Sequence, residues 1–140
     1  MDKITNDPVH KKVLYTDLKN IYSFDTTSRK TECLIRTTNP HYVSDLAYDP
    51  ATELLFWIES KKDLYRTSLK SGSNNTVNEK HLILSDESIS EIAVDSCGGY
   101  IYWVLATGFQ GVVKSLQRAR FDGSNTEIVL GSQKYRGYDP

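Results

Sequence analysis

Three aspartates stand at the same place in a sequence that repeats. Asp7 and Asp49 each precede a proline, and Asp95 precedes a serine. Carboxylates that recur once per repeat can converge on a metal ion, but an aspartate at the end of a strand more often accepts the backbone N–H groups of the turn that follows it. The turn role is favoured for all three, so we expect no metal ion and no cofactor.

Residues for catalysis are few. The three histidines, His10, His41 and His81, fall at different points of the repeat, so their spacing predicts no Ser-His-Asp or Cys-His arrangement. Cys33 and Cys97 lack the CxxC spacing of a zinc site, and their pairing state stays open. No glycine-rich phosphate loop is present in the sequence. We therefore predict no catalytic residue and interpret the chain as not an enzyme.

The repeat itself is defined by three aligned stretches: "ITNDPVHKKVLYTD", "LAYDPATELLFWIE" and "IAVDSCGGYIYWVL". In this alignment Asp7, Asp49 and Asp95 coincide, and an aromatic residue follows each at one position, namely Tyr15, Trp57 and Trp103. We interpret these aromatics as core residues that are mostly buried. The segment "LLFWIES" is apolar at successive positions, which predicts a strand covered on both faces.

Each copy continues with a second alternating strand and then a short apolar strand, so that a unit holds four strands separated by turn residues. Four antiparallel strands repeating at about forty residues are typical of a β-propeller blade. We therefore predict an all-β fold with about three four-stranded blades of a six-bladed propeller, which is a partial ring. The expected blades are residues 3–38, 42–85 and 89–131, with the start of a further blade at 135–140.

The stretches "YDPATELLFWIES" and "ARFDGSNTEIVL" resemble the YWTD repeats, also called low-density-lipoprotein receptor class B repeats. The resemblance covers nearly the whole chain. The fourth residue of the YWTD motif is Asp17 in the first copy, Glu59 in the second and Leu105 in the third. The third copy therefore lacks the acid. Within this family, lipoprotein-receptor relatives, sevenless-type receptor kinases and cueball-like insect membrane proteins are the candidate groups, and "AVDSCGGYIYWV" favours the last.

Composition limits the partners. Seventeen Lys and Arg stand against 18 Asp and Glu, without a basic block, so nucleic acid is not an expected partner. No stretch has the length of a signal peptide or a membrane span. Taken as complete, the chain is expected to be cytoplasmic. As a fragment, which we favour, it is expected to be the extracellular domain of a membrane protein that reaches the membrane through a segment outside this chain.

Partner binding is expected at the loop from Thr107 to Lys114, which is longer in the third copy than in the other two. Its apolar residues Phe109, Val112 and Val113 are the predicted contacts, although they could instead pack on a further blade. In a secreted protein, Asn74 in "NNT" would be a glycosylation site.

The resemblance implies an extracellular interaction module of a receptor-like ectodomain that binds a protein ligand through propeller-face loops. One alternative is part of a six-bladed calcium-dependent hydrolase, and another is a cytosolic scaffold propeller. The expected partners are a protein ligand or the remaining blades of the same propeller. Because a partial ring exposes apolar blade faces, we also expect the isolated chain to associate.

Overall fold

The computed structural model describes residues 3–70, 80–86, 88–107 and 112–131. These residues contain no helix and form three four-stranded antiparallel sheets, each a simple up-and-down meander. The first sheet holds β1 (Ile4–Asp7), β2 (Lys12–Thr16), β3 (Asn20–Asp25) and β4 (Thr31–Arg36). The second holds β5 (Val43–Asp49), β6 (Leu54–Glu59), β7 (Asp63–Ser68) and β8 (His81–Ser85). The third holds β9 (Ile89–Asp95), β10 (Tyr100–Thr107), β11 (Val112–Arg120) and β12 (Glu127–Leu130).

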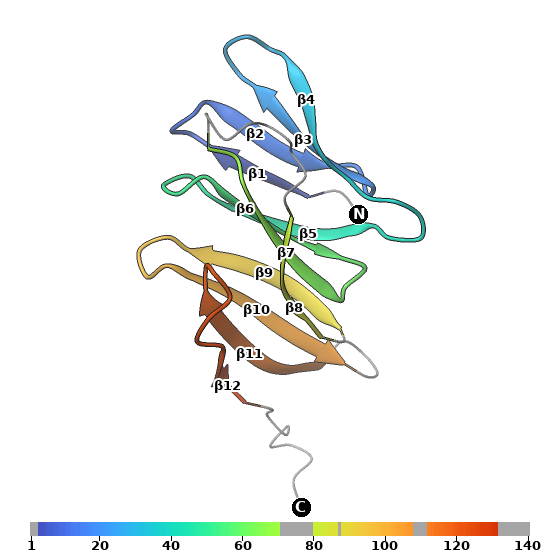
Figure 1. The fold of residues 1–140 in the computed structure, drawn as a ribbon, viewed down its shortest axis with the longest axis vertical. Helices are drawn as coiled ribbons and strands as arrows, with labels where there is room; N and C mark the ends of the chain where they lie inside the picture. The colour runs from blue at the N-terminus through green and yellow to red at the C-terminus, as the bar shows by residue number, and fades with distance from the viewer. Residues whose placement is uncertain (1–2, 71–79, 87, 108–111, 132–140) are drawn as a thin grey trace, which may run out of the picture.

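The sheets follow one another along the long axis of the molecule, with the first at the top of Figure 1 and the third at the bottom. Stacked four-stranded meanders are what the repeat predicted, so the fold class of partial propeller blades is confirmed. Residues 135–140, expected to begin a further blade, lie outside the described residues. Among the described residues, no helix has the length and apolar character needed to cross a bilayer.

Strand register repeats from sheet to sheet. Asp7 pairs with Lys12, Asp49 with Leu54, and Asp95 with Tyr100, so each aspartate opens the same hairpin. The register therefore makes three aromatic positions equivalent on the second strands, namely Tyr15, Trp57 and Trp103.

The second sheet is buried on both faces. Leu55 and Trp57 belong to the apolar core shared with the first sheet, whereas Phe56 and Ile58 belong to the core shared with the third. Because successive side chains of a strand point to opposite faces, a strand between two packed sheets must be apolar at every position. This arrangement explains the uninterrupted apolar run of "LLFWIES". We call each contact between two neighbouring sheets a seam.

Burial of the equivalent aromatics differs at the end of the stack. Trp57 and Trp103 are 0% and 1% exposed, but Tyr15 is only half-buried. Tyr15 is therefore less buried than its two equivalents, because among the described residues no other sheet packs on its face of the first sheet. Tyr15 stacks instead on Tyr22 of its own sheet, with ring centroids 5.2 Å apart.

Candidate functional site

The repeated aspartates act in turns. The carboxylate of Asp7 accepts the N–H of His10 at 3.1 Å. Asp49 accepts that of Thr52 at 3.3 Å, and Asp95 that of Gly98 at 3.1 Å. Among the described residues, no group of three or more His, Cys, Asp or Glu side chains could hold a metal ion. The geometry supports the turn role for each aspartate.

Asp49 also joins two sheets. Its carboxylate is buried and accepts the Ser96 hydroxyl of the third sheet at 2.5 Å and the Thr52 hydroxyl at 2.6 Å. Burial raises the pKa of Asp49, but these hydroxyl and backbone donors outweigh it and hold the pKa below its usual value. The charged form of Asp49 is therefore part of the seam between the second and third sheets.

The seam between the first and second sheets uses a histidine. Nδ1 of His10 lies 2.8 Å from Oδ2 of Asp7, and its Nε2 lies 3.5 Å from Oε1 of Glu53 in the second sheet. Burial raises the pKa of Asp7, but the hydrogen bonds from His10 and from the Tyr48 hydroxyl lower it by more. The pKa of Asp7 therefore lies below its usual value. This cluster joins the first sheet to the turn that precedes β6 of the second sheet.

We expect the free energy of unfolding to fall with acidification, and less so in Asp7→Asn. Because the pKa of Asp7 is depressed in the folded state, its stabilisation is present above the unfolded pKa and is lost as pH falls through the folded one. Urea unfolding at several pH values between about 6 and 3 measures this slope. If the unfolding free energy of Asp7→Asn depended on pH as steeply as that of the unmodified chain, Asp7 would contribute nothing to the pH dependence.

A fourth aspartate was not singled out by the repeat. Asp45 is buried and accepts the N–H of Leu46 at 2.8 Å and that of Ile92 in the third sheet at 3.0 Å. Desolvation raises the pKa of Asp45 above its usual value, against the effect of these two donors. The sequence signal was an acid in the interior of a strand, "VSDLAYD", next to apolar residues, where a buried carboxylate needs dedicated donors.

The acid at the exit of "LLFWIES" binds an aromatic donor. Glu59 Oε2 accepts the indole N–H of Trp57 at 3.0 Å and lies 3.1 Å from Lys80 Nζ. The equivalent position in the third sheet is Leu105, and there the indole nitrogen of Trp103 is buried without a hydrogen-bond partner among the described residues. Loss of the acid in the third copy thus leaves its tryptophan without the partner that Trp57 has.

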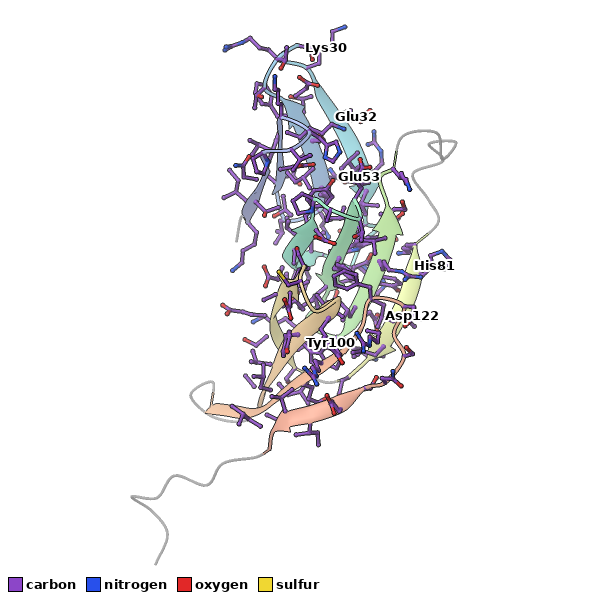
Figure 2. All side chains as sticks on the ribbon, turned by 90° about the vertical axis from the view of Figure 1, so that its left-hand side faces the viewer. Lys30, Glu32, Glu53, His81, Tyr100 and Asp122 are labelled. Carbon is purple, nitrogen blue, oxygen red and sulfur yellow. The ribbon has the colours of Figure 1, made fainter. Side chains whose placement is uncertain are left out.

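The histidines do not come together. His10 lies in the β1–β2 turn, His41 lies before β5 with its Nδ1 3.5 Å from Ser60 Oγ, and His81 is exposed at the start of β8. Figure 2 shows His81 well away from Glu53, which is the partner of His10. No pair of these histidines shares a site in the described residues.

Turns at one end of all three sheets form a continuous surface, which we call the turn platform and which faces right in Figure 1. Backbone hydrogen bonds link its turns in sequence: Val43 N to Leu18 O at 2.7 Å, Ser60 N to Tyr42 O at 2.8 Å, and Ile89 N to Lys61 O at 2.8 Å. The platform comprises residues 17–19, 37–42, 60–62, 86 and 88. Its exposed residues are Asp17, Leu18, Thr38, Asn39, Pro40, His41, Lys61, Lys62 and Asp86.

The predicted partner loop joins this end. Thr107 pairs with Val112 and Ala106 with Val113, so four residues of the expected loop, 107 and 112–114, lie in β10 and β11. Alternating and β-branched residues there can continue the ladder, which shortens the turn itself. Phe109 lies outside the described residues, as does Asn74, and the side chains of Val112 and Val113 are not described. Their proposed contacts therefore stay predictions.

Comparison with curated proteins gives a distant similarity. The chain is 27% identical over 143 residues to "Protein cueball" of Drosophila yakuba and, likewise, of Drosophila simulans. Each match covers 94% of this chain but only 21% of the relative, so the chain spans about a fifth of the length of these relatives. No family model matches the chain.

Solved structures share the fold. An oligogalacturonate lyase in complex with manganese aligns over 94% of this chain and 40% of its own, with a TM-score of 0.71 and 14% identity. Hydrazine synthase of Kuenenia stuttgartiensis aligns over 94% of this chain and 36% of its own, with a TM-score of 0.68 and 13% identity. At such identities the likeness shows the propeller fold alone.

One interpretation needs correction. We interpreted the chain as not an enzyme because its sequence holds no catalytic cluster. That interpretation is contradicted by the alignment with oligogalacturonate lyase, an enzyme, which shows that a propeller of this kind can carry catalysis. The alignment concerns fold and assigns no reaction to this chain.

Proposed function

We propose that this chain is a protein-interaction module of propeller type, in an extracellular receptor-like ectodomain, and that it binds a protein ligand through the turn platform. The platform carries the proposal. Its turns are hydrogen-bonded to one another, so its exposed side chains sit on a frame that loses little conformational entropy on binding. The extracellular location rests on the resemblance to YWTD repeats and on the similarity to cueball.

The chemistry of the platform fits a polar protein surface. Lys61, Lys62 and Asp17 are exposed on the platform, so this surface carries both signs of charge. Mixed charge at an interface favours one docking orientation and speeds association more than it adds affinity. Phe109, which lies outside the described residues, stays the apolar contact predicted from the sequence.

A charge reversal tests the platform. We expect Lys61→Glu with Lys62→Glu to weaken binding of a protein ligand at least about tenfold, since it reverses two charges at the contact. The chain can be screened as an immobilised bait against an array of purified extracellular domains, and each hit titrated by surface plasmon resonance. Phe109→Ala, measured alongside, should also weaken binding while leaving the melting temperature unchanged.

Lys11→Glu with Lys30→Glu is the matched control. Lys11 and Lys61 both have a φ of 56° and both are exposed, but Lys11 lies at the opposite end of the sheets. This control should bind like the unmodified chain. The proposal would be contradicted by an array without a hit, or by hits that respond equally to both pairs of substitutions.

A further inference from the structure

The open face of the third sheet carries an unusual set of side chains. Arg118 lies over the ring of Tyr100 at 3.9 Å, and Arg120 lies over the same ring at 4.3 Å. Arg118 also donates to the Tyr102 hydroxyl at 3.1 Å and pairs with Glu127. Tyr100 is labelled in Figure 2. Tyrosine and arginine are the residues that most often dominate protein interfaces.

In the second sheet, the equivalent face contacts the next sheet. Phe56 and Arg66 are cross-strand partners, as Tyr102 and Arg118 are in the third sheet. Arg66 Nη1 donates to the backbone O of Phe121 in the third sheet at 2.8 Å, and the rings of Phe56 and Phe121 are 5.3 Å apart. The aromatic–arginine pair of one sheet thus binds the next sheet.

Asp45, the acid in the seam between the second and third sheets, also has an equivalent in the third sheet. Asp45 pairs with Ile58 and accepts the N–H of Ile92 across the seam. Glu91 pairs with Val104, the residue equivalent to Ile58, and is exposed. The open face of the third sheet therefore repeats, as Tyr102, Arg118 and Glu91, the group types with which the second sheet holds its neighbour.

The first sheet carries the other half of a seam. Ile4 is 75% exposed, although its equivalents Leu46 and Ile92 are 7% and 9% exposed within seams. Tyr15 stacks on Tyr22 just as the buried Trp57 stacks on Tyr65, at centroid distances of 5.2 and 5.6 Å. The open face of the first sheet thus has the apolar and aromatic set that the second sheet turns toward its predecessor.

We propose that the open face of the third sheet in one copy of this chain binds the open face of the first sheet in a second copy, head to tail. Arg118 and Arg120 then lie against the tyrosine rings of the first sheet, which attract guanidinium groups. Asp17, which accepts the Tyr22 hydroxyl at 2.9 Å, adds an opposite charge to that face. Two such contacts related by a twofold axis close a ring and leave neither face open.

Sedimentation of the 140-residue chain tests the pairing, with one variant for each face. We expect a dimer for the unmodified chain and, for Ile4→Asp and for Arg118→Glu alone, dissociation constants raised at least about tenfold. An equimolar mixture of the two variants should recover association, because the third sheet of the first variant and the first sheet of the second are intact. Lys61→Glu on the turn platform should leave sedimentation unchanged.

Folding is checked for each variant by circular dichroism and thermal melting, and Arg120→Glu replaces Arg118→Glu should the latter unfold. Three outcomes overturn the proposal: an unmodified chain that stays monomeric up to about 100 µM, a single variant that dimerises as before, or a mixture that stays monomeric. Asp17 belongs to both surfaces, but the substitutions expected to disrupt the two contacts lie at different residues, so failure of this pairing leaves the proposed ligand binding untouched, and the reverse also holds.

Discussion

Replacing Trp57 by alanine is expected to lower the free energy of unfolding by about 3 to 5 kcal/mol. The side chain is fully buried in the seam between the first and second sheets, so its removal leaves a cavity as well as losing apolar burial. It also stacks on Tyr65 and donates its indole N–H to Glu59. Loss of that donor leaves the buried Glu59 carboxylate with fewer partners, which adds to the cost.

Tyr15→Ala is the matched control, because Tyr15 occupies the same register position on the first sheet. Its half-buried ring predicts a smaller cost of about 1 to 2 kcal/mol. Urea unfolding followed by tryptophan-independent circular dichroism measures both variants. If both variants lost the same unfolding free energy, burial between two sheets would add nothing to the stability that Tyr15 provides on an open face. That result would contradict the assignment of Trp57 to a core between two sheets.

The fold could be predicted because its determinants are local and repeated. The aligned aspartates and aromatic pairs set the strand register, and a strand apolar on both faces, such as "LLFWIES", requires neighbours on two sides. The repeat alone does not show that Tyr15 is less buried than Trp57 and Trp103, because all three hold the same position within their copies. Position within the stack is a property of the whole chain, and a pattern within one repeat does not encode it.

The polar contacts across the seams could not be predicted. Asp45 meets Ile92, and Arg66 meets Phe121, over separations of 47 and 55 residues. These pairs depend on how far one sheet is rotated and shifted against the next, which strand alternation does not specify. Asp45 itself could have been found, because an acid buried in the interior of a strand carries a high desolvation cost and must have donors.

The position of the fourth YWTD residue shows how one substitution changes a contact. Glu59 satisfies the indole of Trp57, but Leu105 cannot do so for Trp103. Sequence alone identified the missing acid at Leu105. It did not identify the donor that the acid serves, because the indole and the carboxylate are brought together by side-chain orientation along the strand.

Asp49→Ala is expected to cost about 3 kcal/mol, because it removes a buried, charged acceptor of several hydrogen bonds. The lost acceptor serves the hydroxyls of Ser96 and Thr52 together with the N–H groups of Ala51 and Thr52. Asp95→Ala is the matched control: Asp95 opens the equivalent turn but accepts the N–H of Gly98 from a half-buried position. Its loss should cost about 1 kcal/mol, the value of a single turn hydrogen bond.

A double-mutant cycle separates the seam from the turn. Ser96→Ala removes the donor from the third sheet and leaves the turn contacts of Asp49 in place. If the Asp49–Ser96 bond holds the two sheets together, the losses of unfolding free energy in the two single variants should add up to more than the loss in the double variant. We expect the difference to be about 1 to 2 kcal/mol. Additive changes would instead place the whole effect of Asp49 in its own turn, and the seam between the second and third sheets would then depend on apolar packing, on Asp45 and on Arg66.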